Sequence, residues 1–184
     1  MSIASRRRQA GLSLIELVMF IVIVGVAVAG VLSVLTVTAK HSSDPMIQKQ
    51  AQAIAESMLE EIELQAVTYC DPDDANAATA ASAAGCASTA EAMGPEAGET
   101  RHNSPTFDNV NDYHGYAASP IVDITNTPVS GLGSYAVSVS VSQAGAAFAL
   151  PADEVLQIDV RATSGNTDVT VTGYRFRYAP NAVP

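Results

Sequence analysis

The apolar pattern of the chain begins with a long run that contains no charged side chain. Residues 17–39 are uncharged, and Lys40 and His41 end the run. As an α-helix these 23 residues would extend about 35 Å, more than the roughly 30 Å hydrocarbon core of a bilayer. The run therefore predicts a membrane-spanning helix, which we place at residues 12–39.

A second helical pattern follows at residues 40–68. Asp44 and Pro45 suit the cap and first position of a new helix. In a continuous helix, Pro45 would instead remove one backbone hydrogen bond and cause a kink. Apolar residues recur every three or four positions and predict a face packed on a sheet, with an acidic face in solvent. The apolar positions are Ile47, Ala51, Ile54, Met58 and Ile62, and the acidic ones are Glu56, Glu60, Glu61 and Glu63.

From Tyr135 onward apolar positions recur every second residue, which is the period of a half-buried β-strand. Residues 135–142 and 156–163 alternate in this way, and a turn at 164–167 leads into a third strand. The apolar parity shifts after Gly173, which predicts a β-bulge. An antiparallel sheet over residues 133–178, packed on a long N-terminal helix, is an α+β fold.

Charged residues are few and unevenly placed. Nine Lys and Arg stand against nineteen Asp and Glu, a formal net charge of −10. Such a chain lacks the basic face that nucleic-acid binding requires. Three of the nine cations, Arg6, Arg7 and Arg8, precede the apolar run. By the positive-inside rule they predict a cytoplasmic N-terminus and a periplasmic head domain at residues 69–184.

Residues 70–104 have the composition of a long loop, and they include both cysteines. In an oxidising compartment Cys70 and Cys86 are expected to form a disulfide that closes a loop over residues 70–86, worth about 3 kcal/mol. The sequence shows no nucleophile–base pair, phosphate-binding loop or zinc-ligand spacing. We therefore expect neither an enzyme nor a cofactor.

Two acidic stretches raise the question of a metal. Asp71, Asp73 and Asp74 could hold Ca²⁺, but this run lacks the Gly and terminal Glu of an EF-hand loop, and Pro72 favours a turn. Residues 107–116 form the second stretch, for which a loop with Asx-turns is the simpler interpretation. Calcium at the first stretch is thus a weak alternative to the absence of any metal.

Glu16 lies at the start of the apolar helix, where a carboxylate costs up to roughly 2.5–3.5 kcal/mol at full membrane depth. A plain signal anchor has no need of this residue, and a secretory signal peptide has a shorter apolar region before its cleavage site. Cleavage after Gly11 would place the new amine of Leu12 one helical turn from Glu16. Glu16 could then pair with that amine or with the amine of a neighbouring subunit.

The sequence Gly-Leu-Ser-Leu-Ile-Glu-Leu at residues 11–17, behind the arginines and before the apolar run, resembles type IV pilins and type II secretion pseudopilins. The resemblance implies that residues 1–11 are a cleaved leader. It also implies that prepilin peptidase cuts after Gly11 and methylates the amine of Leu12, and that Glu16 serves subunit recruitment. Leu12 replaces the usual Phe of this family, and Ser13 replaces the common Thr.

Residues 71–76, 94–99 and 107–116 resemble MshD-like minor pilins of mannose-sensitive haemagglutinin (MSHA) pili. This implies a low-copy subunit, anchored in the bacterial inner membrane by one span before it enters a pilus. The implied partners are prepilin peptidase, the major and other minor pilins, the inner-membrane assembly platform and, before assembly, membrane lipid. A minor pseudopilin, a signal-anchored periplasmic hydrolase or binding protein, and a tip adhesin are the alternatives. The aromatics that could stack on a ligand of an adhesin are Tyr113, Tyr116, Tyr174, Phe176 and Tyr178.

Overall fold

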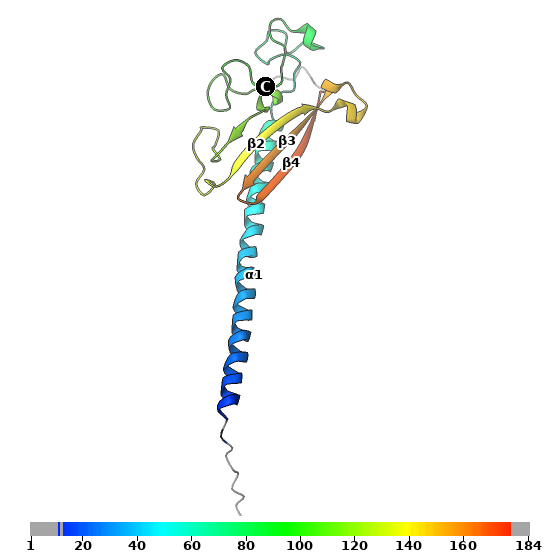
Figure 1. Cartoon of the computed structure of the whole chain (residues 1–184). Coiled ribbons are helices and arrows are strands. Elements are labelled where there is room, and N and C mark those ends of the chain that lie inside the picture. The colour runs from blue at the N-terminus through cyan, green and yellow to red at the C-terminus, as the bar shows by residue number, and fades with distance from the viewer. Residues whose placement is uncertain (1–10, 12, 178–184) are drawn as a thin grey trace, which may run out of the picture. The chain divides into compact units, whose positions relative to one another are not determined.

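The computed structural model describes residue 11 and residues 13–177, and for residues 36–44 it describes the backbone alone. It contains one long helix followed by four strands, the α+β layout that the sequence predicts (Figure 1). Arg6, Arg7, Arg8, Leu12 and Tyr178 lie outside the described residues. The chain divides into two compact units, with the boundary between Pro45 and Met46. The elements are α1 (Leu14–Glu63), β1 (Ala117–Ala118), β2 (Ala136–Gln143), β3 (Val155–Ser164), β4 (Thr167–Phe176) and the short 3-10 helices η1 (Ala83–Gly85), η2 (Val110–Tyr113), η3 (Gly145–Phe148) and η4 (Ala152–Glu154).

Helix α1 includes Pro45, so the expectation of a continuous helix holds and that of a new helix starting at Asp44 does not. It ends at Glu63, about one turn before the predicted end. Ala66 is instead extended, in a bridge with Asn109, and its carbonyl accepts a hydrogen bond from the Val110 N–H at 2.9 Å. The contact of Ala66 with residues 109–110 thus ends the helix, although the apolar pattern of the sequence continues beyond Glu63.

The strands form one antiparallel sheet in the order β1-β2-β3-β4. Two-residue β1 pairs with β2 and was not predicted from the sequence, because so short a strand has no measurable period. Figure 1 shows the sheet lying across the C-terminal part of α1. The buried core combines the predicted face of that helix with alternate residues of β2 and β3. It includes Ala51, Ala55, Met58 and Ile62 of α1, Val137, Val139 and Val141 of β2, and Ile158, Val160 and Ala162 of β3.

The predicted bulge at Gly173 is wrong, because β3 and β4 pair residue for residue through the Ile158–Gly173 position. Gly173 is instead a place where the sheet approaches α1 too closely for a side chain. A Cβ atom there would lie 2.6 Å from Glu63 Oε1 and 2.8 Å from Leu59 Cδ1. The parity shift in the sequence marks a change of face, since Tyr174 and Phe176 lie on the outer side of β4.

Replacing Gly173 by Val should therefore force α1 and β4 apart. We expect the free energy of unfolding to fall by roughly 1 to 3 kcal/mol, the usual cost of overpacking. Urea unfolding of the detergent-solubilised chain measures this. Thr170→Val is the matched control, because Thr170 is exposed on the outer face of the same strand and should tolerate the change. Equal stability of the two variants would contradict this role of Gly173.

Candidate functional site

The N-terminal end of α1 presents the residues of the predicted processing and assembly site. The Ser13 Oγ accepts a hydrogen bond from the Glu16 N–H at 3.3 Å, so Ser13 caps the helix that begins at Leu14. Gly11 and the Glu16 residue are exposed. Leu12 and the three arginines are not described, so the pairing of Glu16 with the amine of Leu12 stays a prediction.

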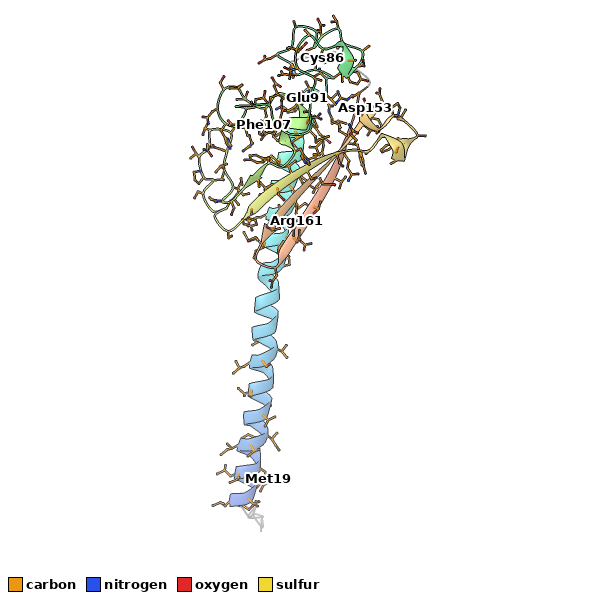
Figure 2. The ribbon with its side chains drawn as sticks, turned by 45° about the horizontal axis from the view of Figure 1, so that its top comes forward. Met19, Cys86, Glu91, Phe107, Asp153 and Arg161 are labelled. Carbon is orange, nitrogen blue, oxygen red and sulfur yellow. A yellow bond between two sulfur atoms is a disulfide. The ribbon has the colours of Figure 1, made fainter. Side chains whose placement is uncertain are left out.

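The stretch Leu14–Leu35 of α1 has a mean hydropathy of 2.9. No residue in its most apolar part is buried. Within the described chain it is the one helix long and apolar enough to cross a membrane. Figure 2 shows the side chain of Met19 extending away from this part of the helix. Exposed apolar surface of this extent marks a site that lipid or another protein covers.

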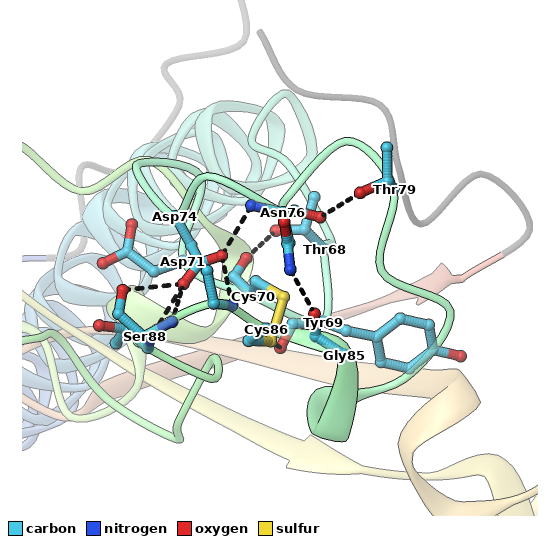
Figure 3. The surroundings of a disulfide bond; sticks show 12 residues. Thr68, Tyr69, Cys70, Asp71, Asp74, Asn76, Thr79, Gly85, Cys86 and Ser88 are labelled. Atoms are coloured by element: carbon cyan, nitrogen blue, oxygen red, sulfur yellow. Dashed lines mark hydrogen bonds between the residues drawn. A yellow bond between two sulfur atoms is a disulfide. The ribbon is translucent and has the colours of Figure 1, made fainter.

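The disulfide between Cys70 and Cys86, predicted from the sequence, is present in the head unit (Figure 3). The adjacent Asp74 carboxylate organises the same loop, because it accepts hydrogen bonds from backbone N–H groups on both sides of the disulfide. Oδ1 accepts from Asn76 N at 2.8 Å and Ala87 N at 2.9 Å, and Oδ2 accepts from Ser88 N at 2.6 Å and Thr89 N at 2.9 Å. These donors, Ala87 first, hold the pKa of Asp74 well below its usual range.

This arrangement changes the interpretation of the first acidic stretch. Backbone donors already satisfy the Asp74 carboxylate, and Asp71 Oδ1 accepts from the Asp73 N–H at 2.7 Å in a local turn. Asp71 has a carboxylate oxygen within 4.8 Å of oxygens of Glu99 and Asp108, whereas Asp71, Asp73 and Asp74 do not all bring an oxygen within that distance of one another. Asp71, Asp73 and Asp74 therefore do not converge on one cation.

A different set of carboxylates does converge. Glu91, Glu96 and Asp112 each place one oxygen within 4.8 Å of the other two. Burial, reinforced by neighbouring carboxylates, raises the pKa of Glu91 to about 9 and the pKa of Asp112 to about 7. Burial also raises the pKa of Glu99 to about 7 and that of Asp108 to about 6. This part of the head thus gathers carboxyl groups in an environment that favours their protonated form.

A half-buried ion pair joins α1 to the loop that precedes η2. Arg101 Nε and Nη2 donate to the two oxygens of Glu61 at 2.7 and 2.6 Å, and the Tyr113 hydroxyl donates to Oε1 at 2.9 Å. The Glu61 side chain is 26% exposed, so the expectation of a solvated Glu61 is wrong. Burial alone would raise the pKa of Glu61, but the guanidinium more than offsets it and the pKa lies below its ordinary value.

The described aromatics proposed for ligand stacking belong to two separate groups. A groove of about 440 Å³ between α1 and residues 121–132 has Ile54, Met58 and Arg101 in its walls and no aromatic residue. Tyr113 is buried in the core, where its ring lies 5.0 Å from that of Phe107. Tyr174 and Phe176 instead meet Phe148 edge to face on the outer face of the sheet, at 5.3 and 5.1 Å between ring centroids.

Comparison with known proteins bears on the N-terminal end of the chain. Residues 6–32 match the family model described as the prokaryotic N-terminal methylation motif. The chain carries a type IV pilin-like processing motif. The matched residues include Gly11 and Glu16, the positions predicted for processing and assembly. No curated protein and no solved structure matched the chain.

The sequence did not predict the head residues whose side chains contact residues far away in the chain. Arg101 carries one available signal, since it is the single Lys or Arg between Lys49 and Arg161 in an acidic chain. A lone cation in such a segment is expected to pair with a carboxylate, but the sequence does not say which. Glu91 and Glu96 carry no comparable signal, because they lie in a loop without periodicity.

Replacing Arg101 by Met should leave the half-buried Glu61 carboxylate without its partner. We expect the free energy of unfolding at pH 7 to fall by roughly 2 to 4 kcal/mol. The contribution of Glu61 to stability is present above its ordinary pKa and is lost as the pH falls through the lowered value, so the loss caused by Arg101→Met should shrink as the pH is lowered. Urea unfolding over a series of pH values below 7 measures it.

Arg161→Met is the matched control for this prediction. Arg161 also pairs with a carboxylate, that of Asp168, but the side chains are 55% and 51% exposed. Its loss should change stability by about 0 to 1 kcal/mol. A loss for Arg101→Met no greater than that of this control, or one that does not depend on pH, would contradict the assignment.

Proposed function

We propose that this protein is a minor type IV pilin of the MSHA kind, a structural subunit that enters a pilus or primes its assembly. The observation that carries the proposal is the methylation motif at residues 6–32, which leads into a helix whose apolar stretch Leu14–Leu35 is exposed. Such a helix suits two environments in turn, the inner membrane before assembly and a bundle of pilin helices afterwards. In this proposal the head faces the periplasm and then the filament surface.

The proposed processing removes residues 1–11 and exposes the amine of Leu12 for methylation. Glu16 would then pair with such an amine as subunits pack, because a carboxylate moved out of water needs a partner of opposite charge. The helix itself needs no outside hydrogen bonds, since α1 satisfies its backbone groups internally. Major and other minor pilins and the assembly platform of the inner membrane are the proposed partners.

The same motif is compatible with a minor pseudopilin of a type II secretion system. Deleting the gene and complementing it with the intact chain distinguishes the two. Loss of surface pili and of mannose-sensitive haemagglutination, with normal export of secreted proteins, supports the pilin. Loss of protein secretion with normal pili assigns the chain to a pseudopilus. Normal pili and normal secretion would leave an anchored periplasmic protein and overturn the proposal.

The first prediction from this proposal concerns the mature N-terminus. Intact mass and N-terminal sequencing of the chain from native membranes should show a start at Leu12 with one additional methyl group. Gly11→Val, which adds bulk at the scissile bond, should leave the full leader in place. An unprocessed Met1 or a cut beyond Ala39 in the native chain would exclude prepilin processing.

The second prediction separates an assembly role of Glu16 from a helix-capping role. Glu16→Gln keeps the size of the side chain and removes its charge, so we expect normal membrane levels but loss from the sheared pilus fraction. Ser13→Ala removes the observed cap, a change worth about 1 kcal/mol, and should leave incorporation intact. Similar incorporation of both variants, measured by immunoblot against wild type, would show that Glu16 has no pairing role.

A further inference from the structure

Three carboxylates from separate segments meet in the head unit. Glu91 follows the disulfide loop, and its N–H donates to the Tyr69 carbonyl at 2.9 Å. Glu96 lies in a turn, and its backbone N–H donates to Glu99 Oε2 at 3.2 Å. Asp112 belongs to η2, and each of the three offers one oxygen within 4.8 Å of the other two. The backbone around each residue is thus held by bonds that leave these oxygens available.

Four of the six carboxylate oxygens of this group are buried and lack hydrogen-bond partners among the described residues. They are both oxygens of Glu91, Oε1 of Glu96 and Oδ1 of Asp112. The Asp112 residue is 0% exposed. Its Oδ2 accepts from the N–H groups of Asp108 and Asn109 at 3.0 and 2.8 Å, so its position is fixed while Oδ1 stays unpartnered. Unpartnered buried carboxylate oxygens are costly, and a proton, a water molecule or a cation can compensate them.

The described cation near this group is engaged elsewhere. Arg177 lies within electrostatic reach of Glu91, but its guanidinium donates to the carbonyls of Val67, Thr68 and Asp153 and lies over the ring of Tyr69. The charges that act most strongly on Glu91 are carboxylates, those of Asp112 and Glu96 first. Without a bound cation, the group must keep protons or bear unbalanced charge.

We propose that Glu91, Glu96 and Asp112 bind one calcium ion. The donors are all hard carboxylate oxygens, with no His or Cys among them, and such a set favours calcium, magnesium or manganese over zinc and copper. Calcium accepts six to eight oxygens, including a bidentate carboxylate such as Glu91 offers with both of its oxygens. Magnesium requires a compact octahedron and keeps most of its water, so it should bind this group less well.

The bound ion would tie the segment that follows the disulfide to η2. Extracellular calcium modules have dissociation constants of about 10⁻⁴ to 10⁻³ M, and the same range is expected here. The inference goes beyond the proposed function, since it holds for a pilin and for a pseudopilin alike. Its test uses the folded head and does not depend on processing at Gly11.

The experiment measures thermal unfolding of the full detergent-solubilised chain after treatment with EGTA. At a calcium concentration about 100 times the dissociation constant, the Tm should rise by roughly 5 to 10 °C, and equilibrium dialysis should give about one ion per chain. Magnesium at the same concentration should give a much smaller shift. No calcium-dependent shift, or an equal shift with magnesium, overturns the proposal.

Glu91→Gln is the decisive variant, because Glu91 has no side-chain hydrogen bond to lose among the described residues. It should abolish the calcium shift and yet, in EGTA, be at least as stable as wild type, because it replaces a buried carboxyl group that lies among other carboxylates with a neutral amide. Asp112→Asn should weaken binding in the same way. Glu60→Gln removes an exposed charge from α1 and should respond to calcium like wild type. A calcium response in Glu91→Gln equal to that of wild type would place the ion elsewhere and refute the site.

Discussion

The apolar first half of α1 must be kept out of water, and the design of the chain depends on this constraint. Its stretch Leu14–Leu35 is long enough to cross a bilayer, and its large hydrophobic side chains are exposed. A helix is the one open-ended structure that can do this, because each backbone group finds its partner within the segment. Lipid or neighbouring helices must then cover the side chains. The methylation motif at residues 6–32 overlaps this stretch, so the motif and the exposed apolar surface share residues 14–32.

In the head, the scarcity of cations decides which carboxylates can be neutralised. The chain has nine Lys and Arg for nineteen Asp and Glu, and three of the nine precede residue 11. Arg101 neutralises Glu61, Arg161 pairs with Asp168, and Arg177 is taken up by backbone carbonyls. Asp74 is satisfied by backbone N–H groups. Glu91, Glu96 and Asp112 thus lie close together, and the arginines named above have other partners.

The parts of the structure with a repeating pattern were predictable, and the parts built by pairing across loops were not. The helical face through Ala51 and Met58 and the strands at residues 136–143 and 155–164 follow directly from their periods. The disulfide follows from two cysteines in a segment that is expected to be exported. Gly173 was misinterpreted because a parity shift has two causes, an extra residue or a change of face, and only the packing of α1 on β4 distinguishes them. The Glu61–Arg101 pair spans 40 residues and lacks any local signature.

Asp74 and Glu61 show two ways in which this chain compensates a carboxylate that is withdrawn from water. Asp74 uses N–H groups that its own loop folds around it, and Glu61 uses a guanidinium that a distant segment delivers. Glu16 and the Glu91 group have neither solution within the described chain, and for both we propose a partner from outside it: another subunit's amine in one case and a calcium ion in the other. If so, the stability of the subunit depends on its surroundings, because neighbouring subunits and dissolved calcium supply the two compensating charges.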